Sequence, residues 1–168
     1  MKKTTYLFLF LTSITLISNC GIYKFNGGST GDAKTIQVDF FPNQASLIEP
    51  QLSQRFTQEM QDLFLRQTNL DLTNTGGDLR FEGEITGYRI NPMSATSQQT
   101  AAQNRLTITV NVRFYNRRKE EEDFEKQFSF YSDFDANAQL TGGILEAALD
   151  EILERITQDI FNASLADW

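Results

Sequence analysis

The sequence predicts an α+β fold, a two-layer sandwich in which two helices cover one face of a four-stranded, mainly antiparallel sheet. Three observations support this prediction. Four segments alternate apolar and polar residues, as strands with one buried side do, and two segments repeat apolar residues at helical spacing. The segments follow one another in the order β-α-β-β-β-α. Each has one apolar side, and stacking the helices on the sheet buries all of these sides together.

The first strand is predicted in residues 34–42, where Ile36, Val38 and Phe40 alternate with the polar residues Gln37 and Asp39. A helix is expected from Pro50, because proline fits the first turn of a helix, where an N–H group has no partner in any case. We expect this helix to end near residues 68–69. Its apolar side chains recur at helical intervals on one stripe: Leu52, Phe56, Met60, Leu63 and Phe64.

The second strand is predicted in residues 78–91. Its apolar phase contains Gly83 and Gly87, and glycine inside a strand often marks a bulge or a close approach of another part of the chain. The sequence leaves two interpretations open: a helix that crosses close above this strand, or a β-bulge. With strict alternation, the polar side of the strand carries Arg80, Glu82, Glu84, Thr86 and Tyr88.

The third and fourth strands, residues 105–116 and 124–134, are joined by a charged turn and predict a long hairpin. Sequential strands usually lie side by side, so we expect the second, third and fourth strands to pair as antiparallel neighbours. The last helix is predicted in residues 140–165. Its polar side is acidic, whereas helices that lie on membranes prefer Lys and Arg there. This helix therefore belongs on the core of the protein.

The N-terminus has the pattern of a secretory signal. Lys2 and Lys3 precede an apolar run of 12 residues, which is shorter than the roughly 20 that a membrane-spanning helix needs. The single cysteine, Cys20, follows, and residues 16–20 (LISNC) resemble the lipobox of bacterial lipoproteins, in which the cysteine becomes the acylated first residue. Asn19 stands where that motif usually has Gly, Ala or Ser. The alternative is an ordinary signal peptide followed by a coincidental cysteine.

We therefore expect three parts: residues 1–19 as a lipoprotein signal peptide, residues 20–33 as a tether lipidated at Cys20, and residues 34–168 as one α+β domain. Several acyl chains, palmitate among them, would hold the chain to a membrane, whereas one chain anchors only weakly. Removing residues 1–19 takes away two lysines and no acid, so the formal net charge changes from −7 to −9. A chain this acidic is a poor candidate for nucleic-acid binding.

The composition also argues against an enzyme. The sequence has no histidine, so the commonest general base and metal ligand is absent. Acylation of Cys20 would leave no thiol for a nucleophile or a zinc site. The glycine-rich phosphate motifs and the G-x-S-x-G motif do not occur. A pair of carboxylates could still serve a hydrolase. We expect no catalytic residue, no metal site and no cofactor.

The predicted sheet has a second face that the helices leave uncovered. It would carry many neutral hydrogen-bonding side chains, which suits contact with polar protein walls or sugar hydroxyls; a solvated face is the alternative. Arg80, Arg105 and Arg113 could each hold a phosphate by two hydrogen bonds, and the alternative for each is a cross-strand salt bridge. The candidate partner-binding residues on this face are Thr107, Thr109, Asn111, Tyr115 and Tyr131.

Several segments resemble the LptE-like family of lipopolysaccharide-assembly lipoproteins, in a form like that of Bacteroidetes. They are residues 20–25 (CGIYKF), 34–62, 77–92 (GDLRFEGEITGYRINP), 106–116 (LTITVNVRFYN) and 124–134 (FEKQFSFYSDF). The resemblance implies a non-enzymatic lipoprotein of the outer membrane that plugs an LptD-type β-barrel, helps it assemble and contacts lipopolysaccharide. Family contacts to lipopolysaccharide are basic, which makes Arg105 and Arg113 the candidates here. The anchor is expected in the periplasm-facing leaflet.

Two other functions are compatible with the sequence. One is a periplasmic scaffold or activator lipoprotein that binds a cell-wall enzyme or a transporter. The other is the carboxylate-based hydrolase. The acidic balance of the chain argues against strong, charge-driven binding of lipopolysaccharide and favours the role of a plug.

Overall fold

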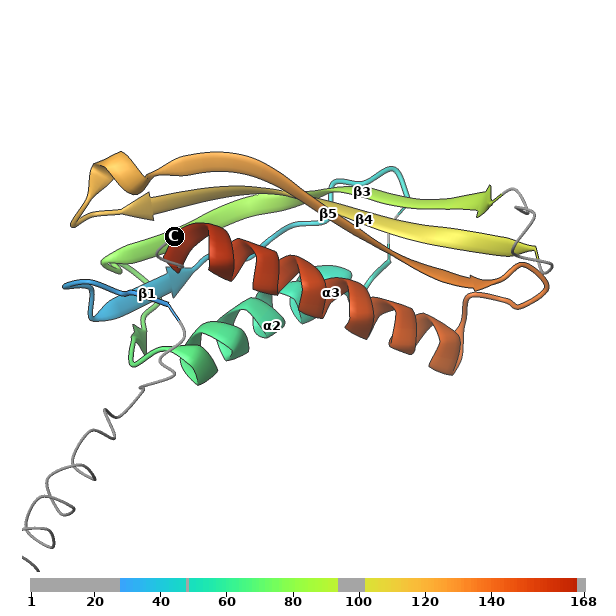
Figure 1. Cartoon of the computed structure of the whole chain (residues 1–168), viewed down its shortest axis with the longest axis horizontal. Coiled ribbons are helices and arrows are strands. Elements are labelled where there is room, and N and C mark those ends of the chain that lie inside the picture. The colour runs from blue at the N-terminus through green and yellow to red at the C-terminus, as the bar shows by residue number, and fades with distance from the viewer. Residues whose placement is uncertain (1–27, 48, 94–101, 166–168) are drawn as a thin grey trace, which may run out of the picture.

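The computed structural model describes residues 28–47, 49–93 and 102–165. The predicted signal peptide and Cys20 lie outside these residues. Figure 1 shows the elements, which are β1 (Thr35–Val38), α2 (Leu52–Gln67), β2 (Asp71–Leu72), β3 (Leu79–Met93), β4 (Gln103–Asn116), the 3-10 turn η1 (Glu120–Glu122), β5 (Phe124–Asp135) and α3 (Gly142–Leu165). The α+β fold class is confirmed.

The sheet differs from the prediction in the number and direction of its strands. It has five strands in the order β2-β1-β3-β4-β5, and β1 runs parallel to both β2 and β3. The antiparallel pairing of β3 with β4 and of β4 with β5 is confirmed. The parallel pairing follows from the connection, because α2 returns the chain to the start of β1 before β3 begins. The two-residue β2 is too short to show any periodicity.

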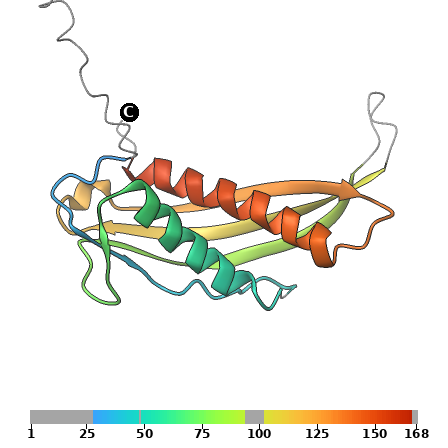
Figure 2. The same cartoon turned by 90° about the horizontal axis from the view of Figure 1, so that it is seen from below.

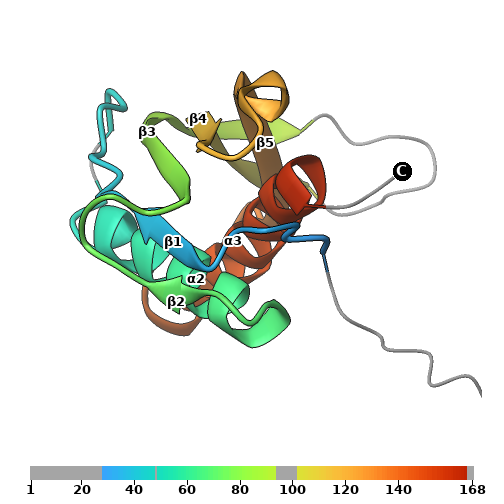
Figure 3. The same cartoon turned by 90° about the vertical axis from the view of Figure 1, so that its left-hand side faces the viewer.

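The two helices cover the same face of the sheet, as predicted. Figure 3 shows both helices below β3, β4 and β5, and Figure 2, seen from below, shows α2 and α3 in front of the strands. The opposite face carries no element of the described chain, and we call it the open face. No helix among the described residues has the length and apolar character needed to cross a membrane.

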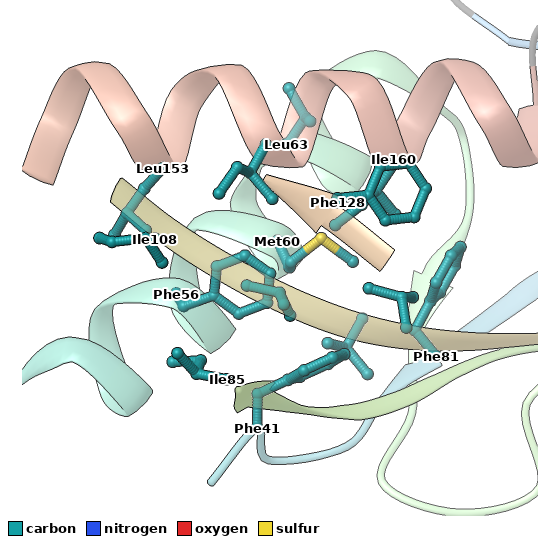
Figure 4. Close-up of a cluster of buried hydrophobic side chains, with 14 of the residues drawn as sticks. Phe41, Phe56, Met60, Leu63, Phe81, Ile85, Ile108, Phe128, Leu153 and Ile160 are labelled. Atoms are coloured by element: carbon teal, nitrogen blue, oxygen red, sulfur yellow. The ribbon is translucent and has the colours of Figure 1, made fainter. Parts of the chain in front are cut away.

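A single core fills the space between the two layers. Every residue of the predicted apolar stripe on α2 is buried. The ring of Phe81 lies 4.7 Å from that of Phe64 and 4.8 Å from that of Phe114, and Phe41 meets Phe56 edge-on at 5.0 Å. Figure 4 shows this cluster between strands and helices. On α3, the apolar side chains that recur at helical spacing are buried from Ala148 onward, whereas Ile144 in the first turn is 42% exposed. The placement of Phe40 on the buried side of the first strand was wrong, because β1 ends at Val38 and Phe40 is 60% exposed.

The glycines of β3 have two separate roles. A β-bulge between Ile85 and Gly87 shifts the register against β4, so the bulge interpretation is correct there. The shift turns Tyr88 to the helix side, where it is 5% exposed; the prediction that Tyr88 lies on the open face was therefore wrong. At Gly83, a Cβ atom would lie 2.0 Å from the backbone oxygen of Asn111 and 2.7 Å from the Phe41 ring. A phenylalanine ring, not a helix, makes the close approach.

The part of the predicted tether that the structure describes contacts the domain. The N–H of Ser29 donates to the backbone oxygen of Leu165 at the end of α3 (2.6 Å), and Ala33 is buried in the core. Further along, Asp78 ties β1 to the start of β3. Its carboxylate accepts from the N–H of Lys34 (2.9 Å) and of Thr35 (3.2 Å), and the Arg118 guanidinium donates to it. The bond from Lys34, with the others, lowers the pKa of Asp78 to about 2.

Candidate functional site

The open face is the candidate functional site. Alternate side chains of each strand point to it, and the registers place them in rows across β1, β3, β4 and β5. The residues that belong to it as predicted are Arg80, Glu82, Glu84, Thr86, Arg105, Thr107, Thr109, Asn111, Arg113, Tyr115 and Tyr131. Gln127, Ser129 and Asp133 of β5 also lie on it, together with Gln37 and Asp39 at the end of β1. Glu125 belongs to it as well; its alternation with Gln127 was the signal that the sequence analysis missed.

One end of the open face holds a continuous chain of ion pairs, which we call the charge ladder (Asp39, Arg80, Glu82, Arg113 and Glu84). Arg80 donates to one Asp39 oxygen through Nε (2.9 Å) and Nη2 (2.7 Å) and also contacts Glu82. Arg113 donates to Glu82 through Nε (3.1 Å) and to Glu84 through Nη2 (3.0 Å). The ladder therefore joins β1, β3 and β4 side by side.

The ladder extends to β5 through Asn111. Its amide nitrogen donates to Glu84 (3.1 Å) and to Glu125 (2.8 Å), and Tyr115 donates to Glu82 at 3.4 Å. The bonds from Arg113 lower the pKa of Glu84, and those bonds raise the pKa of Arg113 above its ordinary value. Both groups therefore stay charged at neutral pH.

On β4 and β5 the middle of the open face is neutral, and we call this part the hydroxyl belt (Thr107, Thr109, Gln127, Ser129 and Tyr131); Arg89 of β3 borders it opposite Thr107. Thr109 and Ser129 share a hydrogen bond at 3.1 Å, and the Ser129 hydroxyl also donates to the backbone oxygen of Ile108 at 3.0 Å. Docking a partner on such a belt does not require the removal of water from a full charge, which is the more costly step.

Beyond the belt, Arg105 forms the third cluster. Its guanidinium donates two bonds to Asp133, at 2.7 and 2.8 Å, and lies 3.5 Å from the centre of the Tyr131 ring. The bonds from Arg105 lower the pKa of Asp133. A bidentate pair combined with ring stacking fixes the guanidinium in one place.

Arg80, Arg105 and Arg113 thus form cross-strand salt bridges, which is the alternative that the sequence allowed for each. Arg89, which the bulge places opposite Thr107, is a fourth arginine of the open face. The face carries six carboxylates, those of Asp39, Glu82, Glu84, Glu125, Asp133 and Asp135, so it has an excess of two negative charges. A lipopolysaccharide phosphate at Arg105 or Arg113 would have to displace a carboxylate that the arginine already holds. Binding of lipopolysaccharide by these two residues stays a prediction.

Two further features bear on chemistry. A groove of about 570 Å³ runs between α2 and α3 and is lined mainly by charged and amide side chains, with Leu63 and Leu153 as its apolar part. Arg55 bridges it by donating to Glu146 and Asp150 of α3. In the described ranges, no group of three or more His, Cys, Asp or Glu side chains is arranged to hold a metal ion.

Comparison with known proteins places the chain in a family. A family model described as lipopolysaccharide-assembly, LptE, matches residues 33–164, which is most of the chain. The chain belongs to the LptE family. The family is one of non-enzymatic assembly lipoproteins, so membership supports a role in lipopolysaccharide assembly in the cell envelope and agrees with the expectation that the chain is not an enzyme. Comparison with the curated proteins found no match.

Solved structures share the fold at low sequence identity. A hypothetical protein from Chlamydia trachomatis is 9% identical with a TM-score of 0.54, over 80% of this chain and 99% of that one. A protein from Xanthomonas campestris is 8% identical with a TM-score of 0.52, over 82% and 86%. The rare lipoprotein B from Shewanella oneidensis is 11% identical with a TM-score of 0.47, over 76% and 92%. At such identities the likeness to the first two structures concerns the fold alone, and the third, with its lower TM-score, supports no conclusion.

Proposed function

We propose that this chain is an outer-membrane lipoprotein, anchored through acylated Cys20 to the periplasm-facing leaflet, that plugs an LptD-type β-barrel and assists its assembly during lipopolysaccharide transport to the cell surface. The observation that carries the proposal is the match of the LptE family over residues 33–164. The open face supports it, because a polar surface with internally paired charges suits the polar interior wall of such a barrel.

In this proposal the hydroxyl belt and its neighbours Asn111 and Tyr115 contact the barrel. Hydroxyl and amide groups both donate and accept hydrogen bonds, so they can match polar wall residues of either kind. The charge ladder orients the strands and adds little net attraction, because its ions are already paired. Lipopolysaccharide contact through Arg105 and Arg113 is the second part of the proposal.

Depletion of the protein in its own organism tests the main part. Lipopolysaccharide should accumulate below the cell surface, and the barrel partner should remain misassembled, as shown by surface labelling and by the mobility of the unheated barrel in gels. Normal surface lipopolysaccharide after depletion would refute the proposal. Recovery of a cell-wall synthase without a barrel, after mild detergent extraction, would support the scaffold or activator function instead.

Binding of purified lipopolysaccharide to the full-length chain tests the second part. Asp133→Asn releases Arg105 from its carboxylate partner, so it should strengthen binding several-fold if Arg105 holds a phosphate. Arg105→Gln should weaken binding relative to the unchanged chain. If neither substitution changes the affinity for lipopolysaccharide, Arg105 does not belong to the proposed site.

A further inference from the structure

The sheet ends in a long free edge at β5. This strand has 12 residues, contains no proline and pairs with β4 from Phe124 to Asp135 without a break in register. The other edges are short or interrupted: β2 has two residues, and β3 carries a bulge and Pro92 where it extends past β1. Bulges, prolines and short strands are the usual means of preventing further strand pairing, and β5 has none of these three.

The direction of the β5 backbone groups follows from the hydrogen bonds around it. Ala136 donates its N–H to the backbone oxygen of Ala102 at 3.0 Å, just past the pair of Gln103 and Asp135. Because bonded and non-bonded pairs alternate in an antiparallel ladder, the even-numbered residues of β5 bond to β4. On the other edge of β4, the N–H of Arg117 donates to the backbone oxygen of Asp78. Odd-numbered residues of β4 therefore bond to β3 there, which leaves the even-numbered residues to bond to β5.

The odd-numbered residues of β5 therefore point their N–H and C=O groups away from the sheet. In the described part of the chain, no group accepts a hydrogen bond from the N–H of Gln127, Ser129, Tyr131 or Asp133. Their side chains are exposed, whereas the neighbours Thr107 and Thr109 on β4 are half-buried. The edge of β5 is thus open to an incoming strand.

We propose that the free edge of β5 from Phe128 to Asp135 binds an extended, basic segment of a partner polypeptide, which adds to the sheet as a sixth strand. Lys126 limits the site at one end. It occupies a helix-side position of the strand and places its charge 5.2 Å from the Phe128 ring, and such an inward charge opposes strand pairing.

The surroundings of the edge define the chemistry of the segment. Asp133 and Asp135 lie on the open-face side, and Glu151 of α3 accepts a bond from Ser132 on the helix side. The cations near this stretch of edge, within the described residues, are Arg155 beside the Phe130 ring, Lys126 at the end of the stretch, and Arg105, which Asp133 holds. Positive side chains on the segment would complement these acids. On the helix side, the half-buried ring of Phe130 offers apolar contact. The segment should therefore alternate basic or polar residues with apolar ones.

This proposal does not depend on the proposed function. The hydroxyl belt contacts a partner through side chains on the open face, whereas strand addition uses backbone groups at the edge. A barrel could contact the hydroxyl belt while the edge of β5 stays unoccupied. The two proposals can therefore fail separately.

The test uses the full-length chain in detergent and an eight-residue synthetic peptide that alternates Lys or Thr with Val. Hydrogen exchange should slow at the odd-numbered amides from Ser129 to Asp133 when the peptide is added. Ser129→Pro removes one outward N–H without removing a backbone hydrogen bond to β4, although the hydroxyl bonds to Thr109 and Ile108 are lost, and it should weaken peptide binding at least tenfold. Ser129→Ala is the matched control, because it loses the same hydroxyl bonds and keeps the N–H; its affinity should stay within twofold.

A second comparison needs no variant. The same peptide N-methylated at every amide cannot donate a hydrogen bond along either edge, so it should not bind the unchanged chain, and a peptide with Glu in place of Lys should bind more weakly. The proposal is overturned if the first peptide does not bind, if methylation or the charge change has no effect, or if Ser129→Pro folds and binds it as the unchanged chain does. If the unchanged chain self-associates and Ser129→Pro abolishes this association, the edge binds a second copy of the chain and not a partner segment.

Discussion

The two faces of the sheet have different roles: the helix-side face stabilises the fold, and the open face presents a surface for recognition. The helix-side face is mainly apolar and is covered by α2 and α3, so most side chains there contribute through packing. On the open face, three arginines and five carboxylates pair with one another on either side of the hydroxyl belt, and Arg89 and Asp135 add a fourth arginine and a sixth carboxylate. Substitutions on the first face should therefore lower stability, and substitutions on the second should mainly change recognition.

The largest loss of stability is expected for Phe81→Ala. Phe81 is fully buried between the rings of Phe64 and Phe114, and truncation leaves a cavity that the strands cannot close. The free energy of unfolding should fall by about 3–5 kcal/mol. Urea denaturation followed by circular dichroism measures it. A loss below about 1 kcal/mol would show that the two layers are not packed as described.

A smaller loss is expected for Gly83→Ala, at the point where β3, β4 and Phe41 meet. The added methyl group would overlap the backbone oxygen of Asn111, which cannot move without breaking the sheet. The cost should be about 1–3 kcal/mol. Gly143→Ala in the first turn of α3 is the matched control, because nothing lies within 4 Å of its added Cβ. If both variants are equally stable, the close approach at Gly83 is wrong.

A pH-dependent effect is expected at Asp78. The folded-state pKa of about 2 lies below the ordinary value of 3.8, so the stabilisation is complete above about pH 5 and is lost as the pH falls towards 2. Asp78→Asn should lower the free energy of unfolding at pH 7 by on the order of 1–2 kcal/mol, since the side chain is only 16% exposed. The difference between variant and unchanged chain should shrink on acidification. A difference that is constant from pH 7 to pH 2.5 would contradict this role.

The smallest effect on stability is expected for Thr107→Arg in the hydroxyl belt. The side chain is half-buried on the open face, and its replacement should change the free energy of unfolding by only about 0.5 kcal/mol. Recovery of the barrel partner from membranes should nevertheless fall, because the added charge would have to be desolvated against the wall. Gln58→Arg on the exposed outer side of α2 is the control. Equal recovery with both variants would argue against docking through the belt.

Sequence periodicity predicted the elements whose burial is set locally. The alternation from Leu106 to Phe114 identified β4, and all five apolar residues of that run are fully buried. Periodicity did not predict the features that depend on how strands pair. β2 exists only because Asp71 and Leu72 lie beside β1, and the bulge at Gly87 inverts the alternation that placed Tyr88 on the open face.

The open face was predictable in composition and not in connectivity. Alternation assigned Arg113 and Glu84 to the same side, but whether Arg113 meets a phosphate or a carboxylate depends on register. The register brings Glu82 opposite Arg113, and the next outward position, Glu84, within reach of the same guanidinium. Three paired arginines in one sheet result from this spatial order, which no local pattern of the sequence contains.

Photo-crosslinking in living cells tests the central claim most directly. A photoreactive amino acid in place of Thr109, in the middle of the hydroxyl belt, should form an adduct with an LptD-type barrel when the cells are illuminated. The same amino acid at Gln58, on the outer side of α2, reports the background. An adduct at position 109 that contains the barrel is the predicted result. An adduct with a cell-wall enzyme, or no barrel adduct in cells that assemble lipopolysaccharide normally, would contradict the account.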